Sequence, residues 1–231
     1  GNILNTCALL VMPGGADLPY CEALNGPGNT QIKSYVEQGG RYFGTCAGAY
    51  YGSNYVLYDE NNQVGQKIEG QRELKFCPGY SRGPLFKSVP HSDLYGKPIS
   101  TSICLNKGLN EKYVTTNKCT QVYYFGGPFF HEIDYYAEGK LTDILASYHI
   151  DPSIEENLFI DPKEAYFFNK NGIKTLPAIV FIQVKKGRVI LSGVHLENEM
   201  FDVENENSKL TRKALLKIVF KKLGLTLRQD S

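Results

Sequence analysis

The chain has 231 residues and a formal net charge of +1, with 25 Lys and Arg against 24 Asp and Glu. A chain of this length buries roughly 70% of its unfolded surface. The balanced charge lacks the basic surface that a nucleic-acid partner needs, and no run approaches the roughly 18 apolar residues of a membrane span. We therefore expect a single domain over residues 1–231, with no nucleic-acid or membrane partner.

The six cysteines are scattered without Cys-x-x-Cys spacing, which argues against a metal site. They are Cys7, Cys21, Cys46, Cys77, Cys104 and Cys119. A domain of this size does not need disulfides to be stable, and no signal-like segment is recognised at the N-terminus. These features predict a reduced, intracellular protein located in the cytoplasm.

The N-terminal part alternates short apolar runs with a helical stretch. Residues 8–12 are apolar and end at Pro13-Gly14-Gly15, which is typical of a buried parallel strand. A loop is expected over 16–20, a helix over 31–38, and a second strand at Tyr42-Phe43. This order predicts a flavodoxin-like, doubly wound α/β sheet that is mainly parallel and binds ligands at the carboxyl ends of its strands.

The second strand leads into Gly44-Thr45-Cys46-Ala47-Gly48, in which a cysteine lies between two glycines. The serine version of this spacing is the nucleophile elbow, a sharp strand-to-helix turn that exposes the reactive atom. A helix that begins after Cys46 also favours a thiolate over a thiol. The pattern equally fits a buried structural cysteine on a tight turn, and an exposed, reactive Cys46 also fits a redox sensor.

Residues 55–150 are interpreted as an inserted β-rich segment that caps the sheet. Gly, Pro and Asn interrupt its short strand-like pieces at residues 56–58, 99–105 and 122–125. Two further segments are rich in glycine and proline and are expected to be loops, at residues 76–84 and 124–128.

Regular structure is expected again near the C-terminus. Residues 178–184 and 188–192 flank Lys185-Lys186-Gly187, which predicts an antiparallel hairpin. A final helix is expected to be capped by Asn207 or Ser208. Its predicted buried residues are Leu210, Ala214, Ile218 and Leu223. Its basic residues are expected to form a solvated face, namely Lys209, Arg212, Lys213, Lys217, Lys221 and Lys222.

A cysteine nucleophile needs a base within hydrogen-bond reach, and that base needs a group to orient it. His195 is the best-placed base because it follows the last strand and precedes Glu197 by two residues. Residues i and i+2 of an extended segment share a face, so Glu197 can hold the imidazole in one tautomer. The other histidines adjoin predicted loops and are His91, His131 and His149.

The order of the motifs PGG, GTCAG and HLE resembles the class I glutamine amidotransferase-like superfamily, which uses a Cys-His-Glu triad. Over about residues 10–197 the chain more narrowly resembles the N-terminal domain of eukaryotic biotin–protein ligases and its stand-alone homologues. The segments that carry this resemblance are PGGADLPY, GTCAGAYYGS, GQRELKFCPGYSRGP, YYFGGPFF and GRVILSGVHLE.

The resemblance implies a role for each matching residue. Cys46 would be the nucleophile, His195 the general base and Glu197 its orienting group, while the backbone N–H groups of Gly15 and Ala47 would form the oxyanion hole. The resemblance and the surrounding loops also suggest substrate-binding residues: Gly14, Asp17, Tyr20, Tyr50, Arg82 and Gly127. Arg82 fits equally well as a structural arginine that bonds loop carbonyls.

Two motif residues depart from the superfamily pattern. Tyr50 stands where a glutamine usually follows the cysteine, and His195-Leu196-Glu197 replaces His-Pro-Glu. Two functions remain open: a thiol amidohydrolase or acyl-transfer enzyme acting on a small-molecule amide or acyl substrate, or a silent regulatory domain that acts with a biotin ligase domain in cis or trans. No cofactor is expected; biotin and ATP would enter only through a separate ligase domain.

Overall fold

The computed structural model describes residues 3–59, 67–86, 98–106, 119–133, 140–150, 167–168, 174–199 and 206–226. The predicted candidate His91 lies outside these ranges. Among the described residues, no helix is long and apolar enough to cross a membrane.

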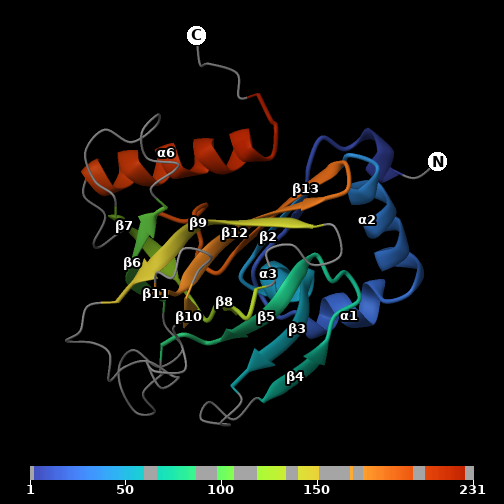
Figure 1. Ribbon diagram of the computed structural model, residues 1–231, viewed down its shortest axis with the longest axis horizontal. Coiled ribbons are helices and arrows are strands. Elements are labelled where there is room, and N and C mark those ends of the chain that lie inside the picture. The colour runs from blue at the N-terminus through green and yellow to red at the C-terminus, as the bar shows by residue number, and fades with distance from the viewer. Residues whose placement is uncertain are drawn as a thin grey trace.

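A seven-stranded sheet forms the centre of the molecule, in the order β1-β2-β13-β12-β9-β6-β7 (Figure 1). Its strands are β1 (Leu10–Met12), β2 (Arg41–Thr45), β13 (Gly187–Ser192), β12 (Pro177–Val184), β9 (Leu141–His149), β6 (Ile99–Leu105) and β7 (Cys119–Tyr124). The pairs β1–β2 and β2–β13 are parallel, whereas β12, β9, β6 and β7 join through antiparallel pairs. The sheet is therefore mixed, and its parallel part is the one that the N-terminal sequence predicts. The β12–β13 hairpin is confirmed.

The crossover between β1 and β2 contains α1 (Leu18–Leu24) and α2 (Pro27–Glu37), and α3 (Ala47–Gly52) follows β2. The predicted loop at 16–20 is wrong in its second half, because α1 begins at Leu18. Pro19 is tolerated there because the first turn of a helix does not use its N–H groups internally.

A second, four-stranded sheet has the order β4-β3-β5-β8. Its strands are β4 (Ile68–Gln71), β3 (Ser53–Tyr58), β5 (Cys77–Gly83) and β8 (Phe129–His131). The inserted segment therefore divides: these strands form a separate sheet, while β6, β7 and β9 extend the main one. The predicted loop at 76–84 is largely strand, because β5 pairs with β3 on one side and β8 on the other.

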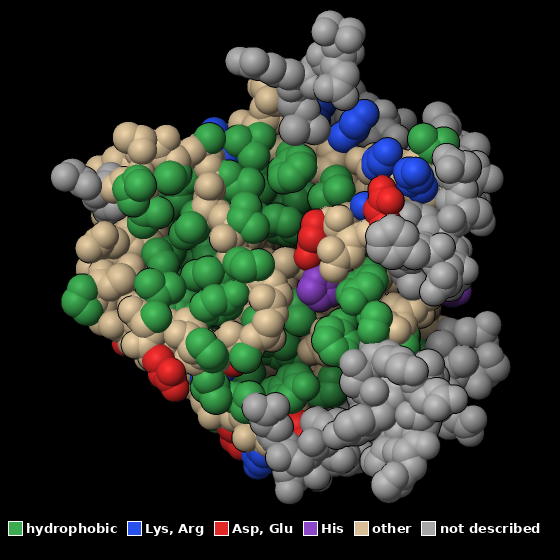
Figure 2. Space-filling model, turned by 180° about the vertical axis from the view of Figure 1, so that it is seen from behind, with side chains coloured by type: hydrophobic (Ala, Val, Ile, Leu, Met, Phe, Trp, Pro, Cys, Tyr) green, Lys and Arg blue, Asp and Glu red, His purple; other side chains and the backbone are tan. Residues whose placement is uncertain are grey.

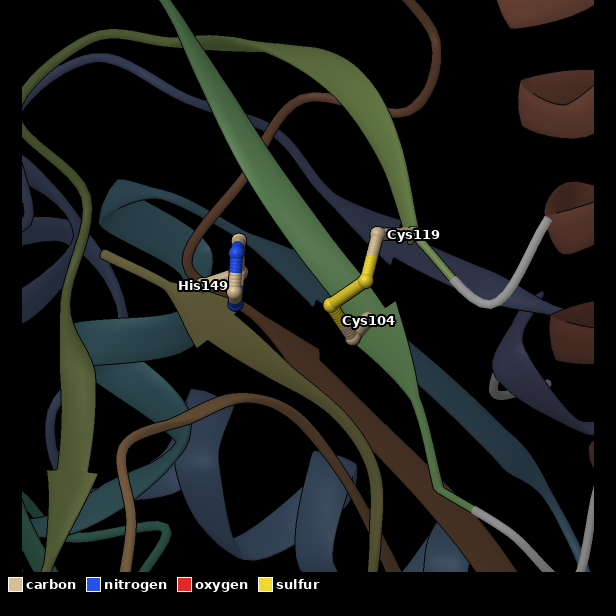
Figure 3. A group of neighbouring side chains, drawn as sticks. All are labelled: Cys104, Cys119 and His149. Carbon is tan, nitrogen blue, oxygen red and sulfur yellow. A yellow bond between two sulfur atoms is a disulfide. The ribbon is translucent and has the colours of Figure 1, made fainter. Parts of the chain in front are cut away.

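Hydrophobic side chains cover much of the face seen from behind in Figure 2, and charged side chains lie both toward its margins and beside a histidine near its middle. Four cysteines are free, but Cys104 and Cys119 are joined by a disulfide (Figure 3). The expectation of a fully reduced set of cysteines is therefore wrong for this pair. The two residues face each other directly on β6 and β7, which a spacing argument along the chain cannot reveal.

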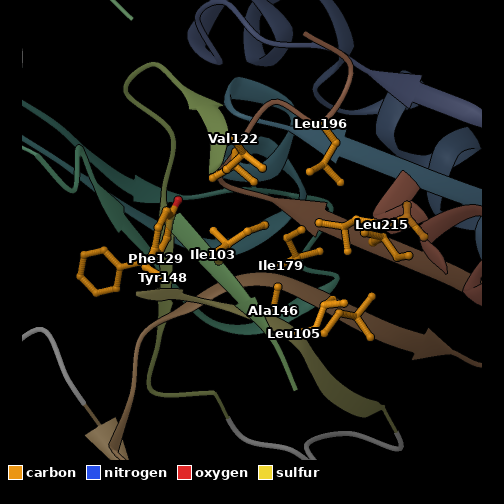
Figure 4. Packing of buried hydrophobic residues seen from close by; sticks show 14 of the residues in the cluster. Ile103, Leu105, Val122, Phe129, Ala146, Tyr148, Ile179, Leu196 and Leu215 are labelled. Atoms are coloured by element: carbon orange, nitrogen blue, oxygen red, sulfur yellow. The ribbon is translucent and has the colours of Figure 1, made fainter. Parts of the chain in front are cut away.

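The main sheet is buried on both faces by two apolar clusters, because its strands alternate side chains between the faces. On β2, Tyr42 packs in the cluster with α2 and α3, and Phe43 packs in the cluster with the C-terminal helix. Figure 4 shows the second cluster, where Ile103, Ile179 and Leu215 come together from separate elements.

The C-terminal helix α6 (Glu206–Lys222) begins before both predicted cap residues, which lie within its first turn. Its buried face is Leu215, Ile218, Val219 and, just beyond it, Leu223, whereas Leu210 is 62% exposed. The predicted stripe is therefore wrong at Leu210, because the helix turns a neighbouring apolar row toward the sheet. Arg212 is also buried rather than solvated, and its guanidinium donates to the carbonyl of Leu196 at 2.8 Å.

Candidate active site

The predicted site residues follow the carboxyl ends of the three parallel strands. Cys46 follows β2, and its N–H donates to the carbonyl of Ser192 at the end of β13 (2.9 Å). The N–H of Gly48 donates to the carbonyl of Pro13, just after β1 (3.1 Å). Adjacent parallel strands end at the same edge of a sheet, so these bonds join three distant segments at the edge where α/β sheets of this type generally bind ligands.

Cys46 lies on the sharp turn that the sequence predicts. Its φ of 50° is in the left-handed region, which is strained for a residue with a side chain, and α3 begins at the next residue. The side chain is buried, and its Sγ–H donates to the carbonyl oxygen of Phe125 at 3.3 Å. The thiol is therefore aimed away from the strand by a conformation that the surrounding contacts must maintain.

His195 and Glu197 form the expected pair. Nδ1 of His195 lies 2.8 Å from Oε1 of Glu197, and the histidine is buried. Burial lowers the pKa of His195, but the hydrogen bonds and charges of Cys46 and Glu197 outweigh it and raise the pKa to about 9. The raised pKa favours the imidazolium form of His195, which is the form that a proton taken from Cys46 would produce.

The other ring nitrogen of His195, Nε2, is buried and has no hydrogen-bond partner of normal geometry among the described residues. Cys46 is close enough to His195 to raise the pKa of the ring. Because no hydrogen bond of normal geometry joins the two side chains, the contact between them is loose. Such loose approaches are common in catalytic pairs before a substrate binds. A buried ring nitrogen without a partner is unusual in a folded core, and a bound water, a ligand or a proton-transfer partner would account for it.

The glycine loop after β1 lies against this pair. A Cβ at Gly14 would be 2.8 Å from Cε1 of His195 and 3.5 Å from the Cβ of Cys46, so only glycine fits without moving the ring. Tyr20 supports the loop, because its hydroxyl donates to the carbonyl of Pro13 at 3.1 Å. Ala47 is the first residue of α3, and its N–H has no acceptor within the helix.

Three buried tyrosines hold the loop at residues 125–128 beside the thiol. The hydroxyls of Tyr50, Tyr124 and Tyr148 donate to the carbonyls of Gly126, Gly127 and Pro128 at 3.0, 2.9 and 2.8 Å. Burial raises the pKa of each tyrosine, so all three remain protonated donors at neutral pH. The sequence did not identify Tyr124 or Tyr148 as support for this loop. Tyr124 ends strand β7, and Tyr148 comes from β9, about 20 residues after the loop, so only the fold brings them together.

Two suggested substrate-binding residues have contacts within the protein. Tyr50 is buried and bonded to the 125–128 loop. At Gly127 an added Cβ would lie 2.0 Å from the carbonyl oxygen of Gly193, so this glycine permits two backbone segments to approach closely. Both residues therefore shape the wall of the site.

Asp17 forms a buried ion pair with Arg72 that the sequence did not reveal. Nε of Arg72 lies 2.7 Å from Oδ2 of Asp17, and each side chain is 6% exposed. The same guanidinium donates through Nη1 to the carbonyls of Gly70 and Gln71, whereas its Nη2 is buried without a partner among the described residues. Arg72 belongs to the segment GQREL, and the resemblance of that segment to the family is the feature of the sequence that points to this residue.

Arg82 and the remaining histidines lie on other elements. Arg82 is buried on β5, with its guanidinium carbon 5.9 Å from the ring centre of Phe129, which favours a cation–π contact. His131 lies on β8 of the second sheet. His149 ends β9 in the antiparallel part of the main sheet.

The fold defines the class of protein. The crystal structure of a glutamine amidotransferase is similar over 94% of this chain and 80% of its own, with a TM-score of 0.50 and 18% identity. At this identity the similarity shows the fold alone. The protein is thus an α/β protein of the class I glutamine amidotransferase-like fold, as the motif order predicts.

The family is shown by sequence. The family model for "Biotin-protein ligase, N terminal" matches residues 3–231, and the chain belongs to this family. A biotin–protein ligase of Schizosaccharomyces pombe is 31% identical over 226 residues, which cover 97% of this chain and 31% of the relative. An uncharacterized protein of Chlamydia muridarum is 28% identical over 92% of this chain and 70% of its own length. The chain thus spans about a third of the yeast ligase.

Proposed function

We propose that Cys46, His195 and Glu197 form a catalytic triad for thiol amidohydrolase or acyl-transfer chemistry on a C–N amide bond. The observation that carries this proposal is the state of His195. Glu197 holds one ring nitrogen at 2.8 Å, while the other is buried and has no partner among the described residues, and Cys46 is close enough to act on the pKa of the ring. This is the nucleophile, base and orienting group that such chemistry requires.

The reaction proceeds in two halves. His195 takes the proton of Cys46, and Sγ attacks the carbonyl carbon of a small-molecule amide or acyl substrate. The tetrahedral intermediate collapses, the C–N bond breaks, and His195 returns the proton to the departing amine. Water, deprotonated by the same imidazole, then attacks the thioester and releases the acid; an amine in place of water gives acyl transfer.

The developing oxyanion needs donors that are already in position. The backbone N–H groups of Gly15 and Ala47 are our candidates, because Gly15 follows β1 beside Gly14 and Ala47 is the first residue of α3. Removing one oxyanion donor from an enzyme typically costs about 3 kcal/mol of transition-state stabilisation. The proposed steps need neither a metal nor a cofactor.

The alternative is a catalytically silent regulatory domain that acts with a biotin–protein ligase domain in cis or trans. It is favoured by Tyr50, whose hydroxyl is bonded to Gly126 beside the thiol, and by the length of the yeast relative, of which this chain covers 31%. In that arrangement biotin and ATP would belong to the separate ligase domain. Under either function we place the protein in the cytoplasm.

The first test is the reactivity of Cys46. Brief alkylation with limiting iodoacetamide near neutral pH, followed by peptide mapping, compares the free thiols Cys7, Cys21, Cys46 and Cys77. We expect Cys46 to react first although it is buried, and His195→Ala to slow its alkylation at least about tenfold. Equal rates at all four thiols would make Cys46 a structural residue and remove the enzyme proposal.

The second test is turnover, which separates an enzyme from a reactive but silent site. The wild-type protein is assayed on a panel of small amides that includes glutamine, with release of the amine as the readout. We expect His195→Ala to lower the rate about 10² to 10⁴-fold, the usual contribution of general base catalysis. Turnover that survives in Cys46→Ser would come from another site, whereas fast alkylation without turnover would favour the regulatory alternative.

A further inference from the structure

Three potential metal ligands gather in the antiparallel part of the main sheet, away from the parallel strands that carry Cys46. Cys104 on β6, Cys119 on β7 and His149 at the end of β9 offer ligand atoms that all lie within 4.8 Å of one another. Figure 3 shows the two sulfur atoms bonded to each other, with His149 on the neighbouring strand.

The strand register places the three residues on one face of the sheet. Cys104 is paired with Cys119 across β6 and β7, and Ser102, two residues earlier, is paired with His149 across β6 and β9. Residues i and i+2 of a strand share a face, so all three side chains point to the same side. The intervening Ile103 is buried in the apolar cluster beneath α6, so the group lies on the opposite face.

We propose that, once the disulfide is reduced, Cys104, Cys119 and His149 bind one Zn²⁺ ion. Two thiolates and an imidazole are preferred zinc ligands, at Zn–S of about 2.3 Å and Zn–N of about 2.0 Å, and water completes a tetrahedral site. The three donors come from adjacent strands, so small side-chain rotations bring them to one centre.

The chemistry couples metal binding to the redox state. A thiol or phosphine reductant breaks the S–S bond and leaves two thiols, the reductant being oxidised in turn. Binding of Zn²⁺ then displaces one proton from each thiol. The same sulfur atoms cannot be disulfide-bonded and zinc-bound, so each state excludes the other. In the cytoplasm that we propose, the reducing thiol pool favours the zinc-binding state.

The experiment compares the oxidised and reduced forms of the full chain. The protein is reduced with a phosphine, freed of reductant under argon and titrated with Zn²⁺ by calorimetry, and separately with Co²⁺ by absorption. We expect one Zn²⁺ per chain in the reduced form, none in the oxidised form, and a thiolate-to-cobalt charge-transfer band. His149→Ala should weaken binding by more than about a hundredfold, beyond the 10- to 100-fold loss typical of groups that only orient a ligand.

Variants separate this site from the Cys46 site, which also contains a thiol and an imidazole. Cys104→Ser should abolish the one-to-one binding, whereas Cys46→Ser and His131→Ala should leave it unchanged. Each variant is checked by circular dichroism, and the oxidised wild-type protein is a folded control without substitutions. Zinc binding that persists in Cys104→Ser, disappears in Cys46→Ser, or is absent from the reduced protein would overturn the proposal.

Discussion

The cysteines in the two parts of the main sheet differ in bonding and environment. In the parallel part, Cys46 lies on a turn with φ of 50°, free and facing a histidine. In the antiparallel part, Cys104 and Cys119 face each other across two strands and are bonded together. The difference follows from geometry. Parallel strands all end at the same edge of the sheet, so the loops that follow them meet there. Antiparallel neighbouring strands place side chains directly opposite one another along their length.

This contrast predicts where stability and reactivity reside. The loops of the parallel part must hold a strained cysteine and a ring nitrogen that no described residue pairs with, so they need support from buried polar contacts. The antiparallel part has its own covalent link and lies against α6. Perturbing the first part should therefore affect both stability and the thiol, and perturbing the second should affect stability alone.

The largest effect is expected at the Asp17–Arg72 ion pair. Asp17→Asn leaves the buried Arg72 without its counter-charge, which should lower the free energy of unfolding by about 3–5 kcal/mol. Urea unfolding measures the loss. The matched control is Lys185→Ala, which removes the exposed Lys185–Glu37 pair and should cost at most about 1 kcal/mol. Similar losses in the two variants would show that burial does not strengthen the first pair.

Reduction of the disulfide should have the next largest effect. The bond closes a loop with a sequence separation of 15, so its loss should lower the free energy of unfolding by about 3 kcal/mol through the entropy of the unfolded chain. Urea unfolding with and without reductant measures it, and Cys104→Ser/Cys119→Ser should be insensitive to reductant. The alkylation rate of Cys46 should not change; a change would mean that the two parts of the sheet are coupled.

Local motifs made the parallel part predictable. The spacing Gly44-x-Cys46-x-Gly48 encodes its own turn, and His195 precedes Glu197 by two residues, so both features follow from neighbours in sequence. The class of fold and the hairpin were predictable for the same reason. The hairpin closes within a few residues, and the class of fold follows from the order of short motifs along the chain, although β2 and β13 pair at long range.

Long-range pairing accounts for what the sequence did not reveal. Strand β5 looks like a loop because of its glycines and proline, and only its two partner strands make it extended. Arg72 and Asp17 are 55 residues apart, and the tyrosines that hold the 125–128 loop come from three elements. On α6 two apolar rows compete, and packing against the sheet selects the one with Leu215 rather than Leu210.

A moderate effect, measured on the reactivity of Cys46, is expected at the glycine loop. In Gly14→Ala the new Cβ would lie 2.8 Å from the His195 ring, which must shift. We expect alkylation of Cys46 to slow about tenfold to a hundredfold, as misplaced catalytic groups typically do. Gly28→Ala is the matched control, because its Cβ meets only the flexible side chain of Leu24. An unchanged rate in Gly14→Ala would show that the ring position does not govern the thiol.

The smallest effect is a shift in the titration of His195. Because its pKa is raised from 6.5 to about 9, the stability that protonated His195 contributes is fully present below pH 6.5 and is lost as the pH rises through about 9. Glu197→Gln removes one of the charges that favour the imidazolium, whereas Cys46 remains, so the pKa should fall to a value between these limits. The loss of stability should then occur at lower pH, with a difference from the wild type on the order of 1 kcal/mol. Titration of the His195 ring proton by NMR and urea unfolding at several pH values measure both quantities.

The matched control is Glu199→Gln, which removes the ion pair with Arg212 instead and should leave the midpoint of His195 unchanged. If Glu197→Gln leaves that midpoint near 9, Glu197 does not act on the ring, and the parallel part of the sheet holds a cysteine–histidine pair without the third member of the triad.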